Sequence, residues 1–125
     1  MPEKNALGDK LGIVALELTA EHAVFTMPVE GNTQVAGVLH GGATAALCEN
    51  AASRAANVYA REKGAVAMGT ELSISHLRPG LRGLVTATAT AEHLGRTRTV
   101  HRVTVKDERG RLVSTALVTN MIVTR

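Results

Sequence analysis

The sequence predicts an α+β fold in which one antiparallel sheet curls around a single long helix. Gly41–Glu62 holds eight alanines and no proline, a composition that favours a helix. The segments on both sides of it alternate apolar and polar residues, and short Gly-containing turns separate them. With 125 residues, 45% of them hydrophobic, the chain has room for one modest core. We therefore expect residues 1–125 to form a single domain.

The strands are expected in two groups. Leu11–Leu18 and His22–Val29 predict a hairpin before the helix. The helix should end at Lys63-Gly64, where a basic last turn precedes a glycine suited to the C-cap. After it, tight turns predict a consecutive antiparallel meander of four strands, Val66–Leu77, Leu84–His93, Thr97–Lys106 and Leu112–Val123.

Composition excludes several classes of function. Cys48 is the only cysteine, so neither an intramolecular disulfide nor a cysteine-cluster zinc site can form. The histidines form no H-x-H or H-x-x-x-H pair, and we expect no metal. Phe25 and Tyr59 are too few aromatics to stack single-stranded nucleic acid. No apolar stretch approaches the roughly 20 residues of a membrane span, and no signal-type segment is present. We expect a soluble, cytoplasmic protein with no membrane or nucleic-acid partner.

Charge is distributed unevenly along the chain. The net charge is −3 over residues 1–60 and +6 over residues 61–125. Four basic residues share one parity along a predicted strand and would form a basic stripe, Arg96, Arg98, Arg102 and Lys106. Such a stripe either faces an anionic ligand or is an ordinary solvated surface.

One carboxylate lies where the predicted helix otherwise presents only small residues. Glu49 shares its face with glycine, alanine and Ser53, and such a stripe usually marks the close approach of another backbone. We therefore expect Glu49 to sit against packed structure and away from open water. A carboxylate so placed is a candidate general base or nucleophile. The alternative is a helix glutamate paired with an arginine from a neighbouring strand.

The residues before the helix suit an oxyanion hole. His40-Gly41-Gly42 leads into the helix N-terminus, where unpaired N–H groups and the positive end of the helix dipole face outward. Gln34 lies six residues before His40, and Glu49 lies two turns inside the same helix. The alternative is a flexible turn, for which glycines are equally suited.

Residues 34–53, from Gln34 through His40-Gly41-Gly42 to Glu49 and Ser53, resemble a family signature. The signature is that of hotdog-fold acyl-CoA thioesterases of the phenylacetate-degradation superfamily. Among these the chain most resembles the branch of 4-hydroxybenzoyl-CoA and 1,4-dihydroxy-2-naphthoyl-CoA thioesterases. The later segments 75–79, 95–96 and 107–113 are also similar, so the resemblance covers nearly the whole chain. It implies the hotdog fold.

The resemblance implies a role for each matching residue. Glu49 would attack the thioester carbonyl or activate the water that does so, and Ser53 would position that water. The Gly41 amide, with His40 beside it, would bind the carbonyl oxygen, and Gln34 would orient the thioester. In the family the carboxylate and the amide come from different subunits, so we expect a homodimer or a dimer of dimers, that is, a homotetramer. Because a thioester is already activated, no cofactor is expected.

The remaining candidates are substrate contacts. Gly42 offers a second amide at the helix N-terminus. His76 resembles a pocket-edge residue of the family, although a half-buried strand histidine is an equal alternative. Arg96 and Arg98 rank first as ligands of the CoA phosphates, and Arg78 is a further candidate.

We therefore expect an acyl-CoA thioesterase for an aryl- or short- to medium-chain acyl-CoA, with an acyl-carrier-protein thioester as a second substrate class. The alternative is a non-catalytic acyl-CoA-binding or regulatory hotdog domain, which would not need Gln34, Glu49 and Ser53 together. A hotdog dehydratase is disfavoured by the nine-residue spacing from His40 to Glu49. The sequence leaves open the acyl group, the tetramer geometry and whether Glu49 is nucleophile or general base.

Overall fold

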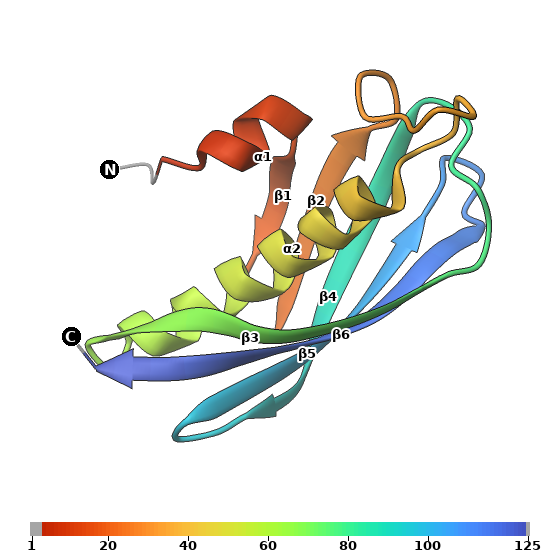
Figure 1. Ribbon diagram of the computed structural model, residues 1–125. Helices are drawn as coiled ribbons and strands as arrows, with labels where there is room; N and C mark the ends of the chain where they lie inside the picture. Colours follow the sequence, from red (N-terminus) through yellow and green to blue (C-terminus); the bar gives the residue numbers. More distant parts are fainter. Residues whose placement is uncertain (1–3, 125) are drawn as a thin grey trace.

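One six-stranded antiparallel sheet wraps around a long helix in the computed structural model, which describes residues 4–124 (Figure 1). All neighbouring strands pair in antiparallel register. The expected α+β class is thus confirmed. Within the described residues the elements are α1 (Ala6–Leu11), β1 (Val14–Leu18), β2 (His22–Pro28), α2 (Gly41–Arg61), β3 (Ala65–His76), β4 (Leu84–Leu94), β5 (Arg98–Lys106) and β6 (Leu112–Thr124).

The strand order β1-β2-β4-β5-β6-β3 corrects the expected topology. β4, β5 and β6 form a meander, but β3 pairs with β6 at the far edge and not with β4. The N–H groups of Leu77 and Arg78 both donate to the Val113 carbonyl, at 2.8 and 3.2 Å, and so fasten the end of β3 to β6. Residues 77–83 then cross to β4. This connection contains Pro79 and is too long for a tight hairpin.

The strand expected over Leu11–Leu18 begins only at Val14, because Leu11 belongs to α1, a helix that the sequence analysis did not predict. Asn5 caps α1 by accepting the Gly8 N–H at 3.0 Å. Gly12, with φ 77°, ends the helix in the left-handed conformation. A helix of six residues makes fewer than two turns, so hydrophobic periodicity could not reveal it.

Helix α2 packs on the sheet through alanine side chains. Ala51, Ala52, Ala55 and Ala56 are fully buried. Such small side chains allow the helix axis to approach the strands closely, and the larger residues that fill the core come mainly from the sheet. The buried large side chains include Phe25, Met27, Val85, Val103, Val105 and Val118. The chain's one long helix therefore has a fixed position over the sheet.

The ends of α2 follow the expectation closely. The helix begins at Gly41 and ends at Arg61, one residue before the predicted end. Gly64, with φ 68°, makes the left-handed turn into β3, and its N–H donates to the Arg61 carbonyl at 3.1 Å. No helix within residues 4–124 is long and apolar enough to cross a membrane.

His101 is a buried titratable side chain of the sheet. Its Nε2–H donates to the Ala20 carbonyl at 2.8 Å, and Nδ1 has no partner among the described residues. Burial lowers the pKa of His101 below its ordinary value of 6.5, although the Ala20 carbonyl and the charge of Glu21 oppose this. As the pH falls below 6.5, the unfolded chain therefore takes up a proton before the folded chain does.

We predict that the free energy of unfolding decreases as the pH is lowered from about 7.5 to about 5, by at most about 1.4 kcal/mol per pH unit from this one group. Urea midpoints measured across that range test the slope. His101→Leu should flatten it, whereas His93→Gln, at an exposed histidine, should leave it unchanged. An equal slope in the wild type and His101→Leu would contradict the assignment.

Candidate active site

The N-terminus of α2 presents one backbone amide with no acceptor among residues 4–124. His40 is the N-cap, and its Nδ1 accepts the Gly42 N–H at 2.8 Å. This bond places the proton of the neutral ring on Nε2. The amides of Ala43 and Thr44 donate to the His40 carbonyl. The Gly41 N–H is therefore the amide that remains to bind a ligand.

A cavity of about 340 Å³ brings together four of the predicted site residues, Gln34, Gly41, His76 and Arg78. His76 is bonded through Nδ1 to Ser114 Oγ at 2.8 Å. Its Nε2 lies against the backbone of Gly41, where an added Cβ would come within 2.7 Å of it. Much of the remaining lining is apolar. The cavity therefore joins an unpaired amide to apolar walls.

Gln34, which lines the same cavity, is held in a tight turn. Its backbone N–H donates to the Val38 carbonyl, and its carbonyl accepts the Gly37 N–H, both at 2.9 Å. Its Oε1 accepts the Ala36 N–H. Because the side-chain oxygen is engaged, Nε2 remains available as a donor. A second donor in the lining of this cavity suits a carbonyl oxygen as ligand.

Glu49 lies in the middle of α2 with its Oε2 over Gly69 of β3. The expectation that it sits away from water was wrong for this chain, because the residue is exposed. Further along this face, Ala56 and Ala60 are buried against Ala65 of β3. The small residues of the same face that precede Glu49 remain partly or fully exposed.

Two asparagines that the sequence analysis missed hold this side of α2 to the sheet. Asn57 bonds both the N–H and the carbonyl of Ala67, at 2.9 and 3.1 Å. Ser53 Oγ donates to Asn120 Oδ1 at 3.0 Å. Asn120 is two residues after the buried Val118, so both side chains point to the core face of the strand. A polar residue at such a position was the signal by which the sequence could have indicated Asn120. Glu49 and Ser53 share a cleft of about 330 Å³.

The amide and the carboxylate are separated within one chain. Gly41 and Glu49 are eight residues apart on α2, which corresponds to about 12 Å along the axis and about 80° around it. They line two different clefts. A single thioester carbonyl cannot reach both groups of the same chain.

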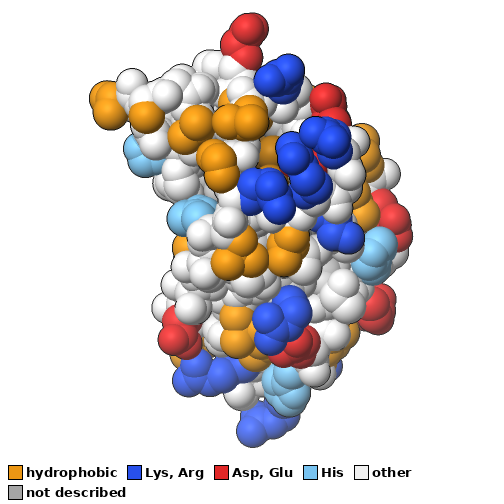
Figure 2. Space-filling view, turned by 90° about the vertical axis from the view of Figure 1, so that its right-hand side faces the viewer, with side chains coloured by type: hydrophobic (Ala, Val, Ile, Leu, Met, Phe, Trp, Pro, Cys, Tyr) orange, Lys and Arg blue, Asp and Glu red, His pale blue; other side chains and the backbone are white. Residues whose placement is uncertain are grey.

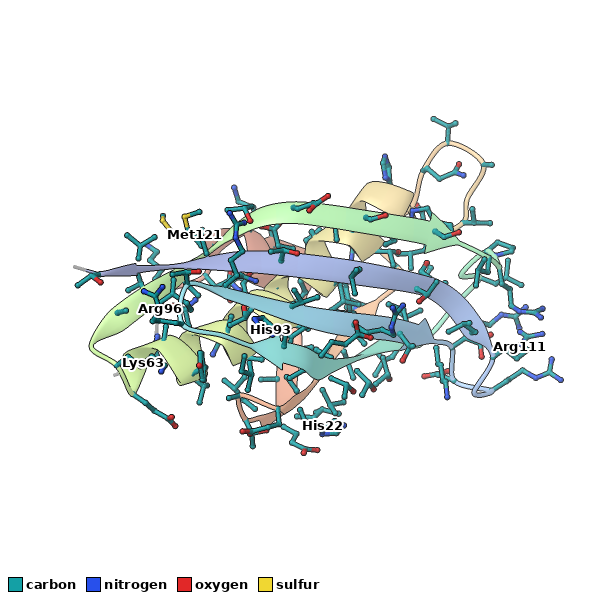
Figure 3. The ribbon with its side chains drawn as sticks, turned by 90° about the horizontal axis from the view of Figure 1, so that it is seen from below. His22, Lys63, His93, Arg96, Arg111 and Met121 are labelled. Atoms are coloured by element: carbon teal, nitrogen blue, oxygen red, sulfur yellow. The ribbon has the colours of Figure 1, made fainter. Side chains whose placement is uncertain are left out.

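Arg96 and Arg98 lie at the end of the molecule opposite Gly41. Tyr59, near the C-terminus of α2, donates its hydroxyl to the Leu94 and Gly95 carbonyls, both at 3.0 Å, and so places the β4–β5 turn there. Figure 3 shows Arg96 beside Met121, far from Arg111 at the other end of the sheet. The structure therefore does not bring these arginines to the cavity of the same chain. Arg102, of the predicted stripe, is paired with Glu92 at 2.7 Å.

Arg78 has basic neighbours at the cavity end. Arg82, four residues after Arg78, lines a further cleft of about 280 Å³. Arg109 and Arg111 line the same cleft. Arg111 is paired with Asp107 at 2.9 Å. Figure 2 faces this end and shows Lys and Arg side chains gathered over its upper part.

Other candidate chemistries find no support in the geometry. Burial raises the pKa of Cys48 to about 12, so its thiol is not a nucleophile near neutral pH. No group of three His, Cys, Asp or Glu side chains in the described part of the chain lies close enough to hold a metal ion.

Comparison with known proteins assigns the class. The model of the thioesterase superfamily matches residues 36–114. A protein of Deinococcus radiodurans named "Putative esterase" is 44% identical over 108 residues, which are 86% of this chain and 68% of that protein. The structure of a Haemophilus influenzae thioesterase superposes with a TM-score of 0.90 at 33% identity, covering 96% of this chain and 84% of the other. The chain belongs to the thioesterase superfamily and is a hotdog-fold thioester hydrolase.

A Staphylococcus aureus thioesterase offers a comparison of spacing. Two of its structures, with TM-scores of 0.91 and 0.89, are 27% and 28% identical to this chain and cover 95% and 93% of it, and 99% and 97% of the other chain. They carry alanine in place of a glutamine and of a glutamate 15 residues further on. Gln34 and Glu49 have the same spacing here.

We predict that Gly69→Ala lowers activity much more than stability. The new Cβ would overlap Glu49 Oε2, the far end of a flexible side chain, so the carboxylate moves while the fold does not. If Glu49 supplies the reacting carboxylate, kcat for thioester hydrolysis should fall about tenfold or more, because misplacing such a group is costly, with little change in the unfolding midpoint. In a Glu49→Ala background the same substitution should have no further effect, and a further loss there would contradict the explanation.

Proposed function

We propose that the protein hydrolyses acyl-CoA thioesters, with the Gly41 N–H binding the carbonyl oxygen and Glu49 supplying the carboxylate. The observation that carries this proposal is the Gly41 amide, which has no acceptor within residues 4–124 and opens to the cavity beside Gln34. The positive end of the α2 dipole acts at the same point. A donor preorganised there stabilises the charge that develops on the carbonyl oxygen in the transition state.

Glu49 and Ser53 supply the hydrolytic step in this proposal. As a general base, Glu49 takes a proton from water while the water oxygen bonds to the carbonyl carbon. The tetrahedral intermediate then breaks its C–S bond, and Glu49 returns the proton to the thiolate of CoA. In the covalent route Glu49 itself displaces the thiolate, and water hydrolyses the resulting anhydride. Neither route needs a metal or a cofactor, because the thioester is already activated.

A second copy of the chain completes the site. The supporting observation is that Gly41 and Glu49 of one chain lie about 12 Å apart along α2 and line separate clefts. The partly exposed stripe of small residues before Glu49 allows another backbone to approach closely. We propose a homodimer, alone or within a dimer of dimers, in which each site takes its amide from one subunit and its carboxylate from the other.

The acyl group is aryl or of short to medium length. The cavity beside Gly41 measures about 340 Å³, near the lower end of the range for small-molecule sites. Apolar side chains such as Val38, Leu77 and Val113 line it. A ring or a short chain fits a space of this size and polarity, whereas a long fatty acyl chain exceeds it.

We predict that Glu49→Gln reduces the release of free CoA thiol by about 10³-fold, equivalent to roughly 4 kcal/mol of barrier, because the amide can neither accept the proton nor act as nucleophile. The assay compares benzoyl-, phenylacetyl-, hexanoyl- and palmitoyl-CoA, and palmitoyl-CoA should be the poorest substrate.

Binding of these thioesters without turnover by the wild type would instead support a non-catalytic acyl-CoA-binding domain. Equal activity of the wild type and Glu49→Gln would show that another residue supplies the carboxylate.

We predict that Arg78, at the mouth of the cavity, contacts the phosphates of CoA. Arg78→Ala should raise KM for benzoyl-CoA about tenfold, as expected for one lost charge-assisted hydrogen bond. KM for S-benzoyl pantetheine, which lacks the phosphates, should not change. Arg96→Ala and Arg98→Ala are the matched comparisons, and a larger KM increase in either would assign the phosphates to the opposite end of the sheet.

A further inference from the structure

We propose that Asn120 is a positioning residue that holds Ser53 as a hydrogen-bond acceptor for the hydrolytic water, an inference that rests on the proposed function. Ser53 Oγ donates to Asn120 Oδ1 at 3.0 Å. A serine hydroxyl has one proton and two lone pairs. With its proton committed to Asn120, Ser53 presents only lone pairs to the cleft that it shares with Glu49.

This commitment sets the orientation of a water molecule between the two side chains. The water must donate one proton to Ser53 and the other to the Glu49 carboxylate, which leaves its own lone pairs directed at the thioester carbon. Without Asn120, the Ser53 hydroxyl would be free to donate to Glu49 or to the water. Either bond would oppose the attack, since the first weakens the base and the second engages a lone pair of the nucleophile.

The sheet places both groups over one row of residues. Gly69 of β3, Asn120 of β6 and Thr99 of β5 are direct neighbours in the register of the sheet. Glu49 Oε2 lies over Gly69, and Ser53 bonds to Asn120 beside it. Asn120 thus bonds to Ser53, which lies one helical turn after Glu49, from the sheet side of the helix. Glu49 itself stays exposed above the same row.

The bond to Ser53 is the only side-chain hydrogen bond that the described residues offer the Asn120 amide. Asn120 is completely buried, and its Nδ2 has no hydrogen-bond partner in the described part of the chain. A buried donor without a partner destabilises a protein, so an apolar side chain of similar size would suit the fold better. The bond from Ser53 to Oδ1 is the one interaction of this side chain that has a chemical use.

Asn120→Leu tests the inference because it removes the acceptor and keeps the volume. With benzoyl-CoA as the probe, or whichever acyl-CoA the wild type hydrolyses fastest, we expect kcat to fall about five- to tenfold and KM to stay within about twofold. The unfolding midpoint should be unchanged or higher. Thr99→Val is the matched control. Thr99 is a buried neighbour in the same row whose hydroxyl has no partner among the described residues, so its loss should leave kcat unchanged.

A double-mutant cycle with Ser53→Ala distinguishes positioning from a structural effect. If Asn120 acts through Ser53, adding Asn120→Leu to Ser53→Ala lowers kcat no further. Wild-type kcat in Asn120→Leu, or losses that multiply in the double variant, would overturn the inference. If Asn120→Leu does not fold, Asn120→Ala takes its place in the same cycle. Absence of thioester hydrolysis by the wild type would instead refute the proposed function, so the two failures are distinguishable.

Discussion

The close packing of α2 on the sheet determines where every candidate group lies. Five alanines of the helix have no exposed surface, and the strands supply the bulk of the core. Because such small side chains leave little space between helix and sheet, a substitution by a larger residue would force the two apart. The helix is therefore a rigid axis that holds an amide at its N-terminus and a carboxylate at its middle.

The same packing explains why the site is divided. The N-terminus of α2 meets the end of β3, where His76 lies against Gly41 and the cavity opens. Eight residues further on, Glu49 lies over Gly69 on a face that the sheet covers only in part. Ser53 and Asn57 bond to the sheet on this side, so the helix cannot rotate to bring the carboxylate to the cavity. In the function proposed above, a second copy of the chain therefore supplies the missing half of each site.

Local sequence patterns were sufficient to predict the fold class. Most of the features that the sequence analysis missed depend on contacts between residues far apart in the chain. The composition of Gly41–Glu62 was sufficient to place α2 within one residue at its C-terminus. The position of β3 was not predictable, because a strand's periodicity does not indicate which edge of a sheet it joins. The exposure of Glu49 also depended on the tertiary structure, since only the course of β3 decides how far that face of the helix is covered. Asn120 is separated from Ser53 by 67 residues, and no local pattern connects them.

The central claim is that one site uses Gly41 of one subunit and Glu49 of the other, and mixing two inactive variants tests it most directly. Gly41→Pro removes the amide donor at a position where proline suits a helix, since Gly41 is the first residue of α2 and His40 before it is extended. Gly41→Ala controls for the added Cβ. Equal mixing of Gly41→Pro and Glu49→Gln subunits should restore about a quarter of wild-type activity, because half of the dimers would be mixed and each would hold one intact site. Mixed dimers, isolated by two tags, that remain as inactive as either parent would contradict the claim.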